Sequence, residues 1–270
     1  MLSALHTIKC YPPDLSHPVF AHYPAMKFGE RRSVEHFAAL LTPLAQRLIA
    51  QARGRACVLA SPPVGGLPSG ANLLCEGLQA KLGGIEVLPL RLADLPEPYE
   101  SDAEFQAYGD YAKLDHKTRR QCQFKDEQIA FDGERIRGRD VIFVNDINVT
   151  GSQMRRMREV LSRARPHRIH WLLILNVAGR IGRRFPQLES EINHSRFTGQ
   201  DELISFLRRS ELCYTSKFVA RLLSFGTASL ERIFRSIDVA TRRGIARAIA
   251  AEGSYSGETF REKIALAEQI

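Results

Sequence analysis

Residues 141–153 combine polar side chains, a hydroxyl-bearing turn and the beginning of a helix-compatible, arginine-rich run. Asn145 and Asp146 follow four consecutive apolar residues, and Thr-Gly-Ser stands at residues 150–152. Four apolar residues without a helical period predict a strand that is buried on both faces, as in a parallel sheet. A strand that ends in a small turn before a helix aims several backbone N–H groups at one point, which suits phosphate binding.

This segment resembles the sugar-phosphate loop of the type I phosphoribosyltransferases. The pattern in that family is four apolar residues, two acids, two mostly apolar residues, a small residue, Thr-Gly and a further hydroxyl residue. Residues 141–152 match the pattern at nearly every position, and Asn145 stands where the first acid is usual. An ordinary strand-turn-helix of another α/β fold is the alternative. A Walker-type loop is disfavoured, because the sequence contains no Gly-x-x-x-x-Gly-Lys-Ser/Thr.

The resemblance implies transfer of a phosphoribosyl group from phosphoribosyl pyrophosphate to a nucleophile, with Mg²⁺ and release of pyrophosphate. Catalysis of this kind is mostly positioning and neutralisation of the leaving group. The residues that would hold the 5′-phosphate are Val149, Thr150, Gly151, Ser152 and Gln153. Asp146 would bind a ribose hydroxyl and lie beside Mg²⁺ as its protein ligand, and Asn145 would hydrogen-bond the other hydroxyl.

Two positions of the segment depart from the family pattern. Asn145 is neutral, so the site has one carboxylate fewer beside Mg²⁺ and beside a positively charged sugar. Val149 replaces a residue that is polar in many relatives, so no general base is visible there. The acceptor is therefore deprotonated elsewhere, needs no base, or is not turned over. The alternative function is a non-catalytic phosphosugar sensor that binds RNA or a protein partner.

A second candidate binding turn follows residues 56–60, an apolar run that predicts the first core strand. In the resembling family the turn after this strand binds pyrophosphate. The corresponding residues here are Pro63, Val64, Gly65 and Gly66, and the two glycines let the backbone approach an anion closely. The basic residue that the family turn often carries is absent. A proline-rich loop without a ligand is the alternative.

Residues 94–124 form a long, polar segment with weak periodicity. Segments of this length inside compact domains are commonly lids or disordered. The resemblance implies a mobile catalytic loop that brings basic side chains to the leaving pyrophosphate. The densest basic cluster consists of Lys117, Arg119 and Arg120, which are the catalytic candidates. A solvated basic helix face explains any one of them equally well.

The rest of the pattern predicts the elements that position these residues. Short apolar runs predict four strands, at residues 56–60, 85–92, 141–144 and 169–177. Pro89 makes an interior position awkward, so the second of these strands is expected at an edge or with a bulge. Asp132-Gly133, between residues 128–131 and 134–137, predicts a β-hairpin that leads into the central strand.

Residues 1–30 are rich in proline, histidine and aromatic residues, and we expect them to cover the core rather than form a regular element. Residues 26–33 faintly resemble a short basic, glycine-containing stretch near the start of orotate phosphoribosyltransferases. Ser33 is the expected N-cap of an amphipathic helix. Residues 197–270 are almost entirely helix-compatible and predict a C-terminal helical subdomain or hood.

The predicted fold class is therefore α/β, a type I phosphoribosyltransferase-like parallel sheet flanked by helices, with a mostly helical C-terminal extension. The expected division is a covering N-terminal segment and helix at residues 1–55, the phosphoribosyltransferase-like core at 56–180, and the helical subdomain at 181–270. Non-core segments of this family form the hood that recognises the acceptor.

Composition bounds the class of protein. The chain has 270 residues, 44% hydrophobic content and a formal net charge of +8, which implies an anionic partner, either a polyphosphate substrate or nucleic acid. The five cysteines are scattered and form no Cys-x-x-Cys, as in reduced cytoplasmic proteins. No run is apolar and long enough to span a membrane. The predicted partner is a phosphosugar rather than nucleic acid, and a homodimer is one assembly that the prediction allows.

The resemblance also extends to domains in bacterial stress-linked gene clusters, including tellurium-resistance clusters, that make nucleotide-like metabolites. The chain is more similar to those domains than to housekeeping purine enzymes. A role in nucleotide metabolism or stress response is the expectation that follows, with the acceptor left open.

Overall fold

The structure is a computed structural model that describes residues 1–93, 129–255 and 257–269. The basic candidates Lys117, Arg119 and Arg120 lie outside these residues.

Five parallel strands form the central sheet, in the order β1-β7-β6-β2-β3. Their bounds are β1 (Leu2–Ile8), β2 (Cys57–Ala60), β3 (Val87–Leu88), β6 (Asp140–Asn148) and β7 (Arg168–Val177). Strand β6 lies in the middle and is buried from Asp140 to Ile147. The apolar residues 141–144 predicted its first half, and the strand continues through Asn145 and Asp146, where we expected it to end. Because all five strands run the same way, their carboxyl ends meet at one edge of the sheet. This confirms the predicted α/β fold class.

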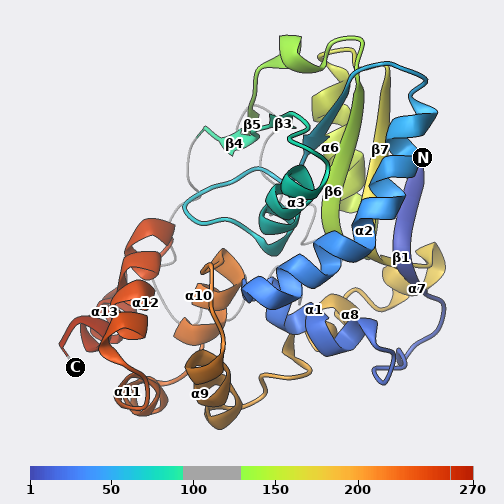
Figure 1. Ribbon diagram of the computed structural model, residues 1–270. Coiled ribbons are helices and arrows are strands. Elements are labelled where there is room, and N and C mark those ends of the chain that lie inside the picture. Colours follow the sequence, from blue (N-terminus) through green and yellow to red (C-terminus); the bar gives the residue numbers. More distant parts are fainter. Residues whose placement is uncertain (94–128, 256, 270) are drawn as a thin grey trace.

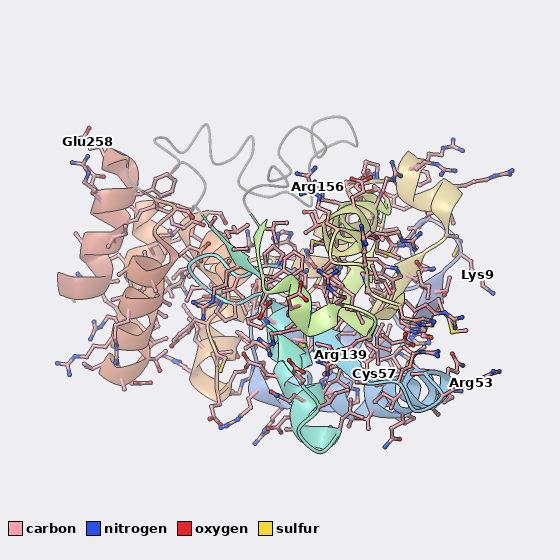
Figure 2. The ribbon with its side chains drawn as sticks, turned by 90° about the horizontal axis from the view of Figure 1, so that it is seen from above. Lys9, Arg53, Cys57, Arg139, Arg156 and Glu258 are labelled. Carbon is pink, nitrogen blue, oxygen red and sulfur yellow. The ribbon has the colours of Figure 1, made fainter. Side chains whose placement is uncertain are left out.

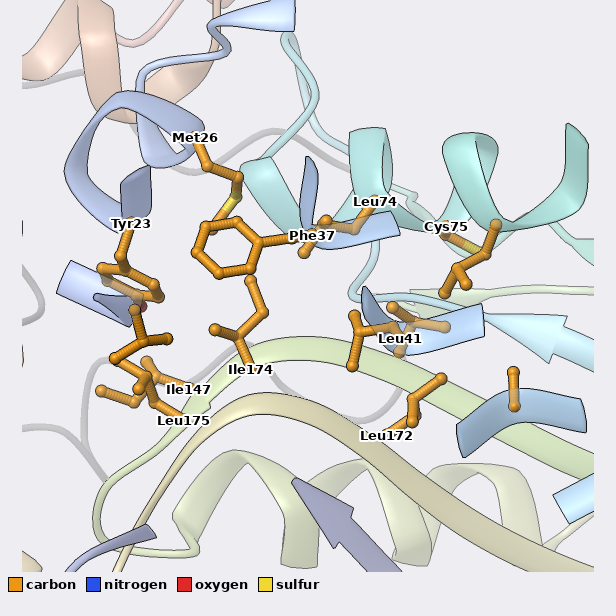
Figure 3. Packing of buried hydrophobic residues seen from close by; sticks show 14 of the residues in the cluster. Tyr23, Met26, Phe37, Leu41, Leu74, Cys75, Ile147, Leu172, Ile174 and Leu175 are labelled. Carbon is orange, nitrogen blue, oxygen red and sulfur yellow. The ribbon is translucent and has the colours of Figure 1, made fainter. Parts of the chain in front are cut away.

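Helices cover both faces of the sheet (Figure 1). Alternate residues of β6 face opposite sides, as in any strand. Ile142 and Val144 belong to the hydrophobic cluster that contains α2 (Arg31–Gln51) and α3 (Gly70–Lys81). Val141 and Phe143 belong to the cluster that contains α6 (Ser152–Ser162). Figure 3 shows the first of these clusters, where Phe37 and Leu41 of α2 pack above Leu172 and Ile174 of β7.

Three shorter helices lie at the carboxyl edge of the sheet, below the strands in Figure 1. They are α1 (Val19–Lys27), α7 (Gly179–Arg184) and α8 (Leu188–His194). Helix α7 begins directly after β7, and α1 packs against α8. Beyond them, five helices form a third hydrophobic cluster: α9 (Gln200–Arg209), α10 (Ser216–Leu223), α11 (Thr227–Arg235), α12 (Val239–Glu252) and α13 (Glu258–Gln269).

The C-terminal helices lie beside the sheet and not over it. In Figure 2, Glu258 at the start of α13 and the pair Lys9 and Arg53 lie at opposite ends of the molecule. The segment after α1 joins the two parts, because the ring of Phe28 stacks on Phe197 with 4.8 Å between centroids. The mostly helical extension predicted for the C-terminal region is confirmed. The domain boundaries at 55/56 and 180/181 stay predictions.

Four local expectations were wrong. Ser33, the expected N-cap, lies inside α2, whose N-cap residue is Glu30. Residues 2–8 form the edge strand β1, which pairs with β7, although we expected no regular element there. Residues 85–92 do not form one strand, because Pro89 separates β3 from β4 (Arg91–Leu92), although β3 does lie at the edge of the sheet, as the proline led us to expect. The predicted hairpin does not form: β5 (Ile129–Ala130) pairs antiparallel with β4, and a 3₁₀ helix occupies Gly133–Ile136. Asp132 caps that helix by accepting a hydrogen bond from the Glu134 N–H.

No helix in the described ranges is both long and apolar enough to cross a membrane.

Candidate functional site

The loop between β6 and α6 has the geometry of an anion cradle. Gly151 precedes α6 with φ +78° and ψ 1°, a left-handed conformation that favours glycine. No side chain caps the start of α6 from this position. The Thr150 hydroxyl donates to Ser152 Oγ at 3.0 Å, and the Ser152 N–H donates back to Thr150 Oγ1 at 3.3 Å. The loop therefore presents hydroxyls and a helix N-terminus at the carboxyl end of the central strand.

Helix α7 supports the loop from behind. A Cβ atom on Gly182 would lie 1.9 Å from the carbonyl oxygen of Val149, so only glycine lets α7 approach the loop this closely. The Val149 side chain is buried in the hydrophobic cluster between the sheet and helices α2 and α3. Its contribution to the cradle is therefore its backbone, and the side chain anchors the loop.

Asn145 is built into the loop. Its side chain is almost completely buried, with 3% of the residue exposed. The amide nitrogen donates to the Ile147 carbonyl at 3.1 Å and to Gln153 Oε1 at 2.8 Å. Because an amide carries two N–H groups, these bonds use both. Asn145 thus joins the end of β6 to the first turn of α6, and Gln153 is held by the same bond.

Asp146 lies in a charged cluster that the sequence analysis did not foresee. Its Oδ2 contacts the ammonium of Lys27 and accepts the Tyr23 hydroxyl at 3.3 Å, and its Oδ1 accepts the Ile147 N–H at 2.8 Å. The same ammonium lies 3.6 Å from Glu189 Oε1. The exposed fractions of the Lys27, Asp146 and Glu189 side chains are 12%, 8% and 15%.

Tyr23 serves as a permanent donor in this cluster. Burial first, and then the negative charges of Asp146 and Glu189, raise the pKa of the Tyr23 phenol well above its ordinary value. The hydroxyl is therefore protonated at any physiological pH. Tyr23 and Lys27 come from α1, and Glu189 comes from α8, so three elements meet at Asp146.

This donor set bears on the expected Mg²⁺ ligand. Both oxygens of Asp146 already accept hydrogen bonds, and one of them contacts an ammonium. Within residues 1–93, 129–255 and 257–269, no three His, Cys, Asp or Glu side chains gather where they could hold a metal ion. As placed, Asp146 does not fit the role of a protein ligand to Mg²⁺.

The second turn lies at the end of the neighbouring strand β2. Val64 pairs with the two-stranded sheet of β4 and β5. Its N–H donates to the Leu90 carbonyl at 2.9 Å, and its carbonyl accepts the Leu92 N–H at 3.0 Å. A cavity of about 390 Å³ opens beside the turn, lined among others by Gly65, Gly66 and Arg91. Arg91 is exposed and brings a cation to a turn that has none in its own sequence.

The far side of this turn is fastened to the C-terminal helices. The Leu67 N–H donates to Glu252 Oε2 at 3.1 Å, and the Ser216 hydroxyl donates to the Leu67 carbonyl at 3.2 Å. A Cβ on Gly66 would lie 2.4 Å from the Ala251 carbonyl oxygen, so this contact requires glycine. Burial raises the pKa of the Glu252 carboxyl, against hydrogen bonds from Ser216 and Leu67 that lower it.

The structure thus places the predicted residues at two neighbouring strand ends. Residues 149–153 and Asp146 lie at the end of β6, and residues 63–66 lie after β2, which pairs with β6. Lys27, Glu189 and Arg91 were missed. The only signal for Lys27 was the basic stretch at residues 26–33, and the signal for Arg91 was the interruption of its strand by Pro89.

A family model described as PRTase ComF-like matches residues 2–266. The search of curated proteins found no match.

Several solved structures are similar at low identity. A hypoxanthine phosphoribosyltransferase from Staphylococcus aureus is 16% identical with a TM-score of 0.34, over 53% of this chain and 64% of that one. An adenine phosphoribosyltransferase from Leishmania donovani is 14% identical with a TM-score of 0.33, over 74% and 80%. A purine phosphoribosyltransferase from Pyrococcus horikoshii is 9% identical with a TM-score of 0.29, over 52% and 87%. The chain therefore spans under two thirds of the length of the Staphylococcus protein.

Proposed function

The chain belongs to the family described as PRTase ComF-like, and from this premise we propose that it binds phosphoribosyl pyrophosphate or a related phosphosugar and transfers its phosphoribosyl group to a base-like or other nucleophilic acceptor. The observation that carries the proposal is the left-handed Gly151 at the start of α6, between two hydroxyl residues. A helix N-terminus with a flexible, hydroxyl-bearing turn binds a phosphate group well.

The two turns divide the ligand between them. In this proposal the backbone and hydroxyls of residues 149–153 hold the 5′-phosphate, and residues 63–66 hold the pyrophosphate. Arg91, which lines the cavity beside the second turn, supplies positive charge to the pyrophosphate. A guanidinium suits this task because its planar fork matches phosphate oxygens.

The reaction breaks the bond between the sugar carbon and a pyrophosphate oxygen, and it forms a bond from that carbon to the acceptor. Positive charge develops on the sugar, and negative charge develops on the leaving group. Asp146, at the end of β6, faces the first of these charges, and Arg91 faces the second. Lys117, Arg119 and Arg120 stay predicted partners of the leaving pyrophosphate. Mg²⁺ stays a predicted partner of the pyrophosphate itself, whose charge it would neutralise.

A sensor without turnover is the second candidate, and Asn145 favours it. Both N–H groups of its amide hold the loop together, which is a structural task. Asp146 is likewise paired before any ligand binds. A protein of this kind would bind the phosphosugar and report it to RNA or to a protein partner. The exposed Arg155 and Arg158 on α6 would then face that partner.

Two measurements test the proposal. Calorimetric titration with phosphoribosyl pyrophosphate, ribose 5-phosphate and pyrophosphate separately should show that the first binds most tightly, because it fills both turns. Release of pyrophosphate in the presence of a panel of nucleobases then separates the transferase from the sensor. If none of the three ligands binds, both candidate functions fail. The cytoplasmic location, a homodimer and a role in stress response stay predictions from the sequence.

A further inference from the structure

The ammonium of Lys27 is held between two carboxylates at the edge of the proposed sugar site. It contacts Asp146 Oδ2 and lies 3.6 Å from Glu189 Oε1, and all three side chains are largely buried. Buried carboxylates need a counter-charge, since leaving one unpaired is strongly unfavourable. Lys27 supplies that charge from α1, where it is the last residue of the helix.

Two features at the end of β6 change its charge in the same direction. At position 145 an amide stands where a second carboxylate was expected, which removes one negative charge. At Asp146 an ammonium is already in place, which adds one positive charge. A divalent ion ligated by Asp146 would lie within a few ångströms of that ammonium, in a poorly hydrated site where like charges repel strongly.

We propose that the Lys27 ammonium takes the place of a divalent cation at Asp146, so that the sugar end of the ligand binds without a metal ion held by the protein. The inference deepens the proposed function and rests on it. An ammonium carries three N–H donors. In the proposal the ammonium keeps Asp146 and Glu189 in position beside the sugar end of the ligand. A metal ion bound only by the pyrophosphate is unaffected.

The experiment has a metal arm and a ligand arm. In the metal arm, Mn²⁺ alone is titrated into wild type, Lys27→Met and the double variant Lys27→Met/Asp146→Asn, and bound Mn²⁺ is followed by electron paramagnetic resonance. We expect Lys27→Met to bind Mn²⁺ about tenfold or more tightly than wild type, because two carboxylates lose their cation. The double variant should lose this gain.

The ligand arm measures the affinity for phosphoribosyl pyrophosphate with Mg²⁺ and with a chelator. The affinity of wild type should differ by about threefold or less between the two conditions. The affinity of Lys27→Met should be about tenfold or more below that of wild type with the chelator, and Mg²⁺ should restore part of this loss. The control is Arg31→Met, which removes an equal charge from an exposed ion pair with Glu211 and should behave as wild type. Lys27→Arg, which keeps the charge, should retain the weak dependence on Mg²⁺ and covers the case in which Lys27→Met does not fold.

Tight Mn²⁺ binding by wild type that Asp146→Asn abolishes would overturn the inference, as would a steep dependence of wild-type affinity on Mg²⁺. Failure of every protein to bind phosphoribosyl pyrophosphate would instead contradict the proposed function. The metal arm still decides the role of Lys27 in that case, because it uses no phosphosugar.

Discussion

The ammonium of Lys27 contacts the carboxylate of Asp146, a residue 119 positions further along the chain. This contact fastens the last turn of α1 to the carboxyl end of the central strand. The hydroxyl of Tyr23, one turn earlier in α1, reaches the same carboxylate. The segment that covers the sheet and the strand that carries the proposed sugar site therefore share one charged cluster.

Breaking this pair should cost stability that removing both charges partly restores. Lys27→Met and Asp146→Asn should each lower the free energy of unfolding, by about 3–5 kcal/mol for a buried pair that loses one partner. The double variant should lose less than the sum of the two. Urea denaturation of the four proteins checks this. Strictly additive losses would mean that the two side chains do not interact in solution.

Asn145→Asp should destabilise the sugar-phosphate loop. A carboxylate at this position has no proton to donate to the Ile147 carbonyl. The free energy of unfolding should therefore fall by about 1–3 kcal/mol. Affinity for phosphoribosyl pyrophosphate should fall with it. Asn148→Asp is the matched control, because Asn148 donates to Asn176, whose amide can turn to donate in return. Equal losses in the two variants, by urea denaturation and calorimetry, would contradict the structural role of Asn145.

Arg91→Gln should weaken binding of pyrophosphate-containing ligands selectively. Hydrogen bonds to charged groups contribute about 1.5–3 kcal/mol, so the affinity for phosphoribosyl pyrophosphate should fall about 10- to 100-fold. The affinity for ribose 5-phosphate should stay unchanged, since that ligand lacks the pyrophosphate to which we assign Arg91. Lys81→Gln, at the end of α3, controls for loss of one surface charge. A uniform loss for both ligands would argue against a site for pyrophosphate beside Gly65 and Gly66.

The central strand and its loop could be predicted because their signals are local. Four apolar residues without a helical period fix β6, and Gly151 between two hydroxyl residues fixes the turn that follows. Each signal lies within thirteen residues of sequence, and no distant partner is needed to read it.

The rest of the site could not be read in this way, because distant segments build it. Lys27 and Glu189 meet Asp146 only after α1 and α8 pack at the edge of the sheet. Arg91 reaches the second turn because the chain leaves β3 at Pro89 and pairs with Val64. Asp132-Gly133 resembled a hairpin turn, but the Asp132 side chain captures the Glu134 N–H and starts a 3₁₀ helix instead. A two-residue turn motif does not show whether a side chain or a backbone carbonyl will accept a given backbone N–H.

Glu252→Gln should stabilise the protein at neutral pH and not in acid. Burial raises the pKa of Glu252 in the folded chain above the ordinary value of 4.5, so folding favours its protonated form. The stability that this protonation contributes is present below pH 4.5 and is lost as the pH rises through the folded pKa. A glutamine can still accept the Leu67 N–H but carries no charge.

Thermal melts from pH 4.5 to 8 check this prediction. The melting temperature of Glu252→Gln should exceed that of wild type at pH 7–8, and the difference should shrink toward pH 4.5. Glu262→Gln, at an exposed position of α13, should show no such trend. A Glu252→Gln protein that is less stable than wild type at every pH would show that the carboxylate is needed as a charged acceptor for the turn.

The most direct test of the anion cradle compares two glycines that share one backbone conformation. Gly151 has φ +78°, and Gly54, at the surface after α2, has φ +82°. A Cβ on Gly54 would meet no atom within 4 Å apart from its chain neighbours. Alanine at either position should cost a similar amount, about 1–2 kcal/mol, in backbone strain. A Cβ on Gly151 would meet only Asn148 Oδ1, at 3.9 Å, so alanine at this position would displace no protein atom.

The decisive measurement is the affinity for phosphoribosyl pyrophosphate by calorimetry in wild type, Gly151→Ala and Gly54→Ala. The account predicts that Gly151→Ala loses about tenfold or more in affinity, because the methyl group occupies the place of the 5′-phosphate. Gly54→Ala should bind as wild type does, although it is destabilised to a similar extent. A Gly151→Ala protein with wild-type affinity would contradict the assignment of this loop as the sugar-phosphate site.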